Sequence, residues 1–128
     1  MNRSFLPLLI LIQGFGSYGF GEDWPTWRGA QGDGSWEASV SRVLPSAGLS
    51  KHWKAELEPG YSGITVSEGR VFTMDRPAHE KENESERVIC LDALSGDRLW
   101  EYAYPVRYQS LDYGKGPRAS ITIIGELA

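Results

Sequence analysis

Few side chains in this 128-residue chain have the type and spacing that catalysis or metal binding requires. The two histidines, His52 and His79, are far apart in the sequence, and neither has a second ligand at helical or strand spacing. Cys90 is the only cysteine, so neither an internal disulfide nor a cysteine metal cluster can form. The sequence therefore predicts no metal site.

Motifs for nucleophilic catalysis and phosphate binding are incomplete. Gly60-Tyr61-Ser62-Gly63 lacks the glycine that follows the serine by two positions in a nucleophile elbow. The run from Tyr113 to Pro117 lacks the lysine and hydroxyl residue that end a phosphate loop, and it indicates a connection between repeats. Three aspartates, Asp23, Asp33 and Asp112, either line a binding face or cap turns, and capping is the favoured interpretation. We expect no catalytic residue, no cofactor-binding residue and no bound cofactor.

The charge balance excludes one class of partner. Thirteen basic and seventeen acidic side chains leave a net charge of −4, so no positive field is present to attract phosphates. Nucleic-acid binding is therefore not expected.

The first residues have the order of an export signal. Arg3 provides a positive start, Phe5 to Ile12 is an apolar run, and small residues follow, with cleavage expected after Gly19 or Gly21. The apolar run is shorter than the roughly 18 residues that a membrane span requires, so no transmembrane anchor is expected. Cys90 lies far from both cleavage sites, which argues against a lipoprotein. We expect residues 1–21 to be a signal peptide and the mature protein to be periplasmic or extracellular.

The elements that must position these residues are short strands separated by turn residues, which indicates an all-β fold. The expected strands are His52 to Leu57, Gly63 to Ser67, Arg70 to Asp75, Arg87 to Leu91 and Arg98 to Tyr102.

Turn chemistry supports the strand assignment. Glu68-Gly69 and Ser95-Gly96-Asp97 are suited to closing hairpins, and the charged stretch from Pro77 to Glu86 is expected to be a solvated loop. Residues 22–50 form a separate N-terminal segment with a turn at Asp33-Gly34, followed by a loop.

Two weak internal repeats occur in the same order. Ile64-Thr65-Val66 recurs as Ile121-Thr122-Ile123. Trp53-Lys54-Ala55 is weakly similar to Trp100-Glu101-Tyr102. The pattern predicts β-propeller blades of four antiparallel strands over residues 51–128. About one blade plus flanking strands fits in this length, so we expect a fragment of a larger propeller that stops within a second blade.

Three segments together resemble the PQQ-like β-propeller repeat family, specifically its exported bacterial quinoprotein-like members. They are Trp24-Pro25-Thr26-Trp27-Arg28-Gly29, the blade signature from Gly69 to Trp100 with Leu91-Asp92-Ala93 and Ser95-Gly96, and Asp112 to Arg118. The resemblance implies that Trp100 packs between neighbouring blades, with Trp53 as its counterpart before the first blade.

The function that the resemblance favours is a non-catalytic binding or scaffolding module. Its partners would be proteins, bound through the propeller faces or an open strand edge. The alternative is the N-terminal part of a PQQ-dependent dehydrogenase whose active site lies in downstream blades. Such enzymes resemble one another in a pair of adjacent cysteines, which this chain lacks. Enzymatic activity is therefore not expected of these residues.

Overall fold

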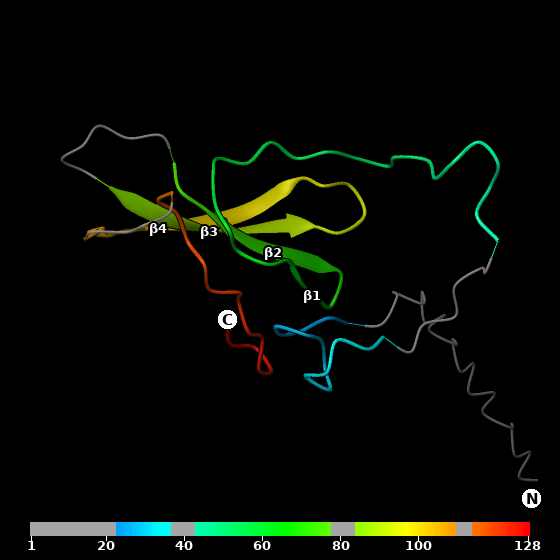
Figure 1. The fold of residues 1–128 in the computed structure, drawn as a ribbon, viewed down its shortest axis with the longest axis horizontal. Helices are drawn as coiled ribbons and strands as arrows, with labels where there is room; N and C mark the ends of the chain where they lie inside the picture. The colour runs from blue at the N-terminus through cyan, green and yellow to red at the C-terminus, as the bar shows by residue number, and fades with distance from the viewer. Residues whose placement is uncertain (1–22, 37–42, 78–83, 110–113) are drawn as a thin grey trace, which may run out of the picture.

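The protein is all-β, with one open four-stranded antiparallel sheet in strand order β1-β2-β3-β4 (Figure 1). The computed structural model describes residues 23–36, 43–77, 84–109 and 114–128, and none of these is helical. The strands are β1 (Thr65–Ser67), β2 (Arg70–Asp75), β3 (Ser85–Asp92) and β4 (Arg98–Pro105). The all-β expectation is thus confirmed. Within the described ranges no helix is long and apolar enough to cross a membrane.

Both expected hairpin turns form where the turn residues predict them. Glu68 and Gly69 have φ values of 49° and 73°, and positive φ at both central residues suits a two-residue hairpin between twisted strands. In the β3–β4 turn, Asp92 accepts hydrogen bonds from the backbone N–H of Leu94 and Ser95 at 2.9 and 2.8 Å. These bonds lower the pKa of Asp92 below its usual value. Gly96 closes the turn at φ 78°.

One predicted strand is absent, and the bounds of three others differ: β1 begins at Thr65 and not at Gly63, β3 spans Ser85–Asp92, and β4 extends to Pro105. Residues 52–57 are not a strand of the sheet; Trp53 instead contacts the β3–β4 turn, and the following Glu58 contacts the end of β2. Ser85 and Glu86 were expected in the loop but belong to β3, where they pair with Pro105 and Tyr104. The predicted loop is described only at its two ends, because residues 78–83 lie outside the described ranges.

Both faces of β2 and β3 are covered, by different parts of the chain, whereas β4 is largely exposed. The first face carries an apolar cluster in which Phe72, Met74 and Cys90 contact Ile121 from the C-terminal segment. The second face carries Ile89, which is fully buried.

The segment before β1 lies on the second face. Glu58 donates its backbone N–H to Asp75 at 2.9 Å, and Thr73 donates its hydroxyl to the carbonyl of Gly63 at 3.4 Å. The indole N–H of Trp53 reaches the carbonyl of Ala93 at 3.0 Å. The segment before β1 is therefore held by hydrogen bonds to β2 and to the β3–β4 turn.

The N-terminal and C-terminal segments meet beyond β1, where both lie near the same edge of the sheet (Figure 1). Trp24 pairs with Val66 of β1 through two backbone hydrogen bonds of 2.7 and 3.0 Å. On the other side, the backbone N–H of Ile123 donates to the carbonyl of Pro25 at 2.8 Å. Residues 121–123, the second copy of the short repeat, are not assigned to a strand, although they make this bond.

Candidate binding site

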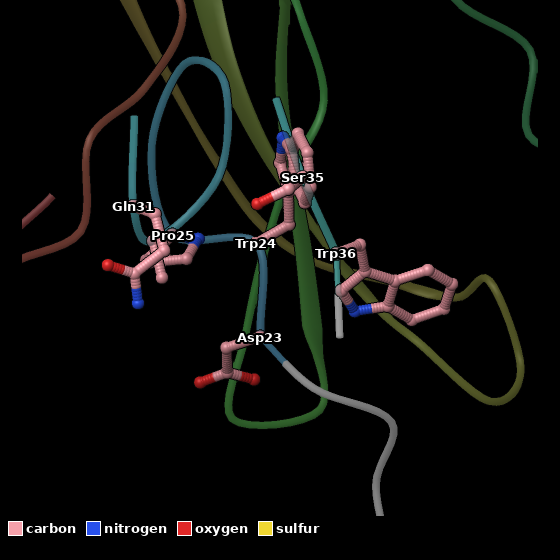
Figure 2. A pocket seen from close by; sticks show the side chains of 7 residues that line it. Asp23, Trp24, Pro25, Gln31, Ser35 and Trp36 are labelled. Atoms are coloured by element: carbon pink, nitrogen blue, oxygen red, sulfur yellow. The ribbon is translucent and has the colours of Figure 1, made fainter. Parts of the chain in front are cut away.

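A hollow of about 250 Å³ lies in the N-terminal segment beside β1. In the view of Figure 2, Trp24 and Ser35 lie between Gln31 on one side and the Trp36 indole on the other, and Asp23 lies below them. The remaining lining residues are Pro25, Ala30 and Gln31. Aromatic walls with a few polar groups are the usual composition of a small-molecule site.

Turns hold this segment in shape although it contains no strand of the sheet. Gly29 donates to the carbonyl of Thr26 at 3.0 Å, and Gly34 donates to the carbonyl of Arg28 at 2.8 Å. Gly29 has φ 78° and lies so close to the Trp24 ring that a Cβ there would come within 2.8 Å of it. The position therefore requires glycine for two reasons, and one face of Trp24 is covered by backbone.

Two of the aspartates singled out in the sequence cap turns in the structure. Asp23 accepts hydrogen bonds from the backbone N–H of Glu68 and the hydroxyl of Ser67, both at 3.0 Å. Asp33 accepts from the backbone N–H and the hydroxyl of Ser35 at 2.8 and 2.6 Å, which lowers the pKa of Asp33. Asp112 lies outside the described residues.

Two groups at the hollow have no hydrogen-bond partner within the described ranges. They are the side-chain amide of Gln31 and the indole N–H of Trp36, and the Trp36 side chain is 52% exposed. A primary amide both donates and accepts, while an indole N–H only donates. These groups are available to a ligand.

A second cluster of polar groups lies at the other end of the sheet. Glu84 binds Arg76 at 3.0 Å and also binds Lys115, and the hydrogen bond from Lys115 lowers the pKa of Glu84. The cations of Arg76 and Lys115 lie 5.5 and 5.6 Å from the centre of the Tyr108 ring. These contacts tie the end of β2 to the chain that follows β4.

Glu86 fixes two tyrosines in the same region. The hydroxyls of Tyr104 and Tyr108 each donate to its carboxylate at 2.7 Å. Burial, reinforced by these bonds, raises the pKa of Tyr104 to about 12 and raises that of Tyr108 as well. Because carboxylates and cations are paired here, the cluster is suited to structural fixation of the connection after β4.

A third feature is a hollow beside Trp100 with a mixed lining, which includes the charged residues Glu68, Arg70 and Glu126. About 390 Å³ in volume, it is bordered by Phe72 and Trp100 of the sheet and by Ile123 and Leu127 of the C-terminal segment. The Trp100 and Phe72 rings lie 6.0 Å apart, and Trp100 remains 42% exposed.

The remaining sequence candidates are not brought together. His52 is exposed outside any strand, and His79 lies outside the described residues. The Ser62 hydroxyl donates to the carbonyl of Gly63 at 3.0 Å. Cys90 is buried, and this burial raises the pKa of its thiol. In the described part of the chain, no group of three His, Cys, Asp or Glu side chains is placed to hold a metal ion.

The glycine-rich run is described from Gly114 onward, and it packs against the segment before β1. The carbonyl of Pro117 accepts a hydrogen bond from the backbone N–H of Tyr61 at 2.9 Å. The Arg118 guanidinium lies 4.9 Å from the centre of the Tyr61 ring and donates to the carbonyl of Gly114 at 2.6 Å. The run is thus a packed connection.

Comparisons with protein-family models, with curated proteins and with solved structures gave no match.

Sequence reasoning missed Gln31 and Ser35 as lining residues, and it also missed Glu86 as the acceptor for two tyrosines. The density of tryptophan between Trp24 and Trp36 was visible as a signal for the first site. The spacing of Tyr104 and Tyr108 was visible for the second, but their meeting with Glu86 depends on the register of β3 and β4.

Proposed function

We propose that this sheet is one blade of an exported PQQ-like β-propeller, and that the protein is a non-catalytic binding or scaffolding module. The observation that carries the proposal is the contact between the two copies of the short internal repeat. The Thr65 hydroxyl, fully buried, donates to the backbone carbonyl of Ile121 at 2.6 Å. The two copies of the repeat thus contact each other, which supports an arrangement of successive units packed as neighbouring blades.

The sheet has the form that a blade needs. Its strands follow one another in sequence order and are all antiparallel. The chain before β1 covers one face, and the chain after β4 reaches the other, through contacts such as Glu58 with Asp75 and Ile121 with Phe72. A blade is buried by the units that precede and follow it, so this arrangement supports the proposal.

The tryptophans support the same arrangement. Trp53 packs onto Gly96, where a Cβ would lie 2.6 Å from the indole, and it donates to the carbonyl of Ala93. Trp100 is its counterpart in the repeat and lies half exposed on the opposite side of the sheet. We expect the β3–β4 turn of a following blade to cover Trp100 as this turn receives Trp53.

The non-catalytic part of the proposal is tested with the complete protein. It is incubated with PQQ and Ca²⁺ together with a series of alcohols and sugars, and reduction of an artificial electron acceptor is followed. We expect no turnover above the protein-free rate. Turnover would assign the protein to the quinoprotein dehydrogenases and overturn the scaffold proposal.

Export is tested separately by cell fractionation and by sequencing the N-terminus of the mature protein. We expect the protein in the periplasm or the medium, beginning at Phe20 or at Glu22. A cytoplasmic protein that retains Met1 would contradict this part of the proposal.

A further inference from the structure

We propose that the hollow lined by Trp24, Gln31 and Trp36 binds a neutral carbohydrate, taking one sugar ring of a longer glycan chain. This inference rests on the proposed function, because it names the ligand of a binding module. It is argued from the shape of the hollow, from the hydrogen-bonding groups left available there and from the charge around them.

The Trp36 indole provides an aromatic surface of the kind that a sugar ring can pack against. The Trp36 indole is 52% exposed and stands clear of the other labelled side chains in Figure 2. A sugar ring presents a face of C–H groups, which can lie flat on such an apolar indole while hydroxyls at its rim stay hydrogen-bonded. Tryptophan offers this combination of an apolar body and a polar N–H.

The hydrogen-bonding groups match hydroxyls. The amide of Gln31 and the indole N–H of Trp36 have no partner within the described ranges, so together they offer donors and an acceptor. The Ser35 hydroxyl donates to Asp33 and keeps lone pairs that can accept. A sugar ring carries several hydroxyls, each of which both donates and accepts, so different hydroxyls can bond to different groups of this lining.

The charged groups around the hollow disfavour both anionic and cationic ligands. Asp23 is the one ionisable residue of the lining, and its carboxylate is engaged by Ser67 and Glu68. In Figure 2 this carboxylate points away from the Trp36 indole. No cation lines the hollow to bind a phosphate, and the carboxylate is turned away from a cationic ligand, so a neutral polar ligand fits best.

The volume of the hollow and the rigidity of its walls suit a single sugar ring. Its volume of about 250 Å³ falls below the range of roughly 300–1,000 Å³ that is usual for drug-sized ligands. The walls are held by the turn bonds of Gly29 and Gly34 and by the pairing of Trp24 with Val66. Such walls need little reorganisation on binding, which favours affinity for a small contact area.

The experiment measures binding of the complete mature protein to six hexasaccharides by isothermal titration calorimetry. The probes are the hexamers of cellulose, chitin, laminarin, xylan, mannan and amylose, each compared with its monosaccharide. We expect at least one hexamer to bind with a Kd below about 1 mM. Tighter binding of the hexamer than of its monosaccharide indicates a glycan chain as the ligand, and equal binding indicates a free sugar.

Variants of exposed residues locate the site without disturbing the fold. We expect Trp36→Ala to weaken binding about tenfold or more, Trp36→Phe to keep it within about threefold, and Gln31→Ala to weaken it. Trp27→Ala is the matched control, because Trp27 is 68% exposed in the same segment but does not line the hollow.

Binding by none of the hexamers, or equal losses in Trp36→Ala and Trp27→Ala, would overturn the inference. These results are independent of the PQQ assay. If the protein turns over a substrate with PQQ and still binds a glycan through Trp36, the scaffold proposal is wrong and the carbohydrate site stands. If it shows neither turnover nor glycan binding, the carbohydrate site is wrong and the scaffold proposal stands.

Discussion

The guanidinium of Arg87 holds the fully buried carboxylate of Asp75 through two parallel hydrogen bonds of 2.9 and 2.7 Å. The two residues face each other on β3 and β2, and Glu58 adds a backbone N–H at 2.9 Å. The pair raises the pKa of Arg87 above its usual value. A planar guanidinium matches a carboxylate in this two-point geometry, so the pair fixes the second face of the sheet to the segment before β1.

Removing Arg87 from its pair with Asp75 should lower the stability of the protein. We expect Arg87→Met to lower the free energy of unfolding by about 3–5 kcal/mol, because Asp75 would be left as an unpaired buried charge. Urea denaturation of the complete protein measures the change. Arg98→Ala is the control, since Arg98 pairs with Glu101 at the surface and should cost no more than about 1 kcal/mol. Equal losses in the two variants would contradict the assigned role of Asp75.

Glycine at position 96 is required by its backbone and by its neighbour. Gly96→Ala places a Cβ 2.6 Å from the Trp53 indole at φ 78°. Gly48→Ala meets nothing within 4 Å at a similar φ of 81°, so it measures the backbone strain alone, about 1–2 kcal/mol. We expect Gly96→Ala to cost clearly more in urea denaturation. Equal costs would mean that Trp53 does not pack on the turn.

Trp100 tests the blade arrangement. If a following blade covers its half-exposed ring, Trp100→Ala should cost about 3–5 kcal/mol in the complete protein. The exposed Trp27 should behave as a surface residue, with Trp27→Ala changing stability by about 0.5 kcal/mol or less. A similarly small loss for Trp100→Ala would refute its position between blades.

The tyrosines of the Glu86 cluster should make the protein sensitive to alkali. The pKa of Tyr104 is raised to about 12, while the unfolded value is about 10. A raised folded pKa means that the stabilisation is complete below the unfolded pKa, and it is lost as the pH rises through the folded one. We therefore expect the free energy of unfolding to fall between about pH 10 and 12.

Urea denaturation across this pH range measures the effect. Tyr104→Phe should lose less stability on alkalinisation than the wild type, because the titrating hydroxyl is gone. Tyr102→Phe is the control, since Tyr102 lies on the same strand and is 66% exposed. An unchanged pH dependence in Tyr104→Phe would show that this hydroxyl is not held by Glu86.

Particular residues show which parts of the fold could be predicted from the sequence and which could not. Glu68-Gly69 and Ser95-Gly96-Asp97 were predictable because each turn is decided by the conformational preferences of its own few residues. Residues 52–57 were not, because an extended segment around the large apolar residue Trp53 can either pair in a sheet or pack on its face, and the local sequence does not distinguish the two. The turn-capping interpretation holds for Asp23 and Asp33, whereas no local signal placed Gln31 in the lining of the hollow.

The sequence by itself determined the all-β class, the two tight turns and the strand cores from Arg70 to Asp75 and from Arg98 to Tyr102. These features depend on local propensity and on the alternation of residues along one strand. Only the tertiary structure decided which segment covers which face, the meeting of Thr65 with Ile121, the burial of Asp75 against Arg87 and the hollow beside Trp36. The first three of these bring together different segments of the chain, and their proximity depends on strand register and on packing of the sheet. The hollow is lined by residues 23–36 alone, and its shape depends on the turns within that segment.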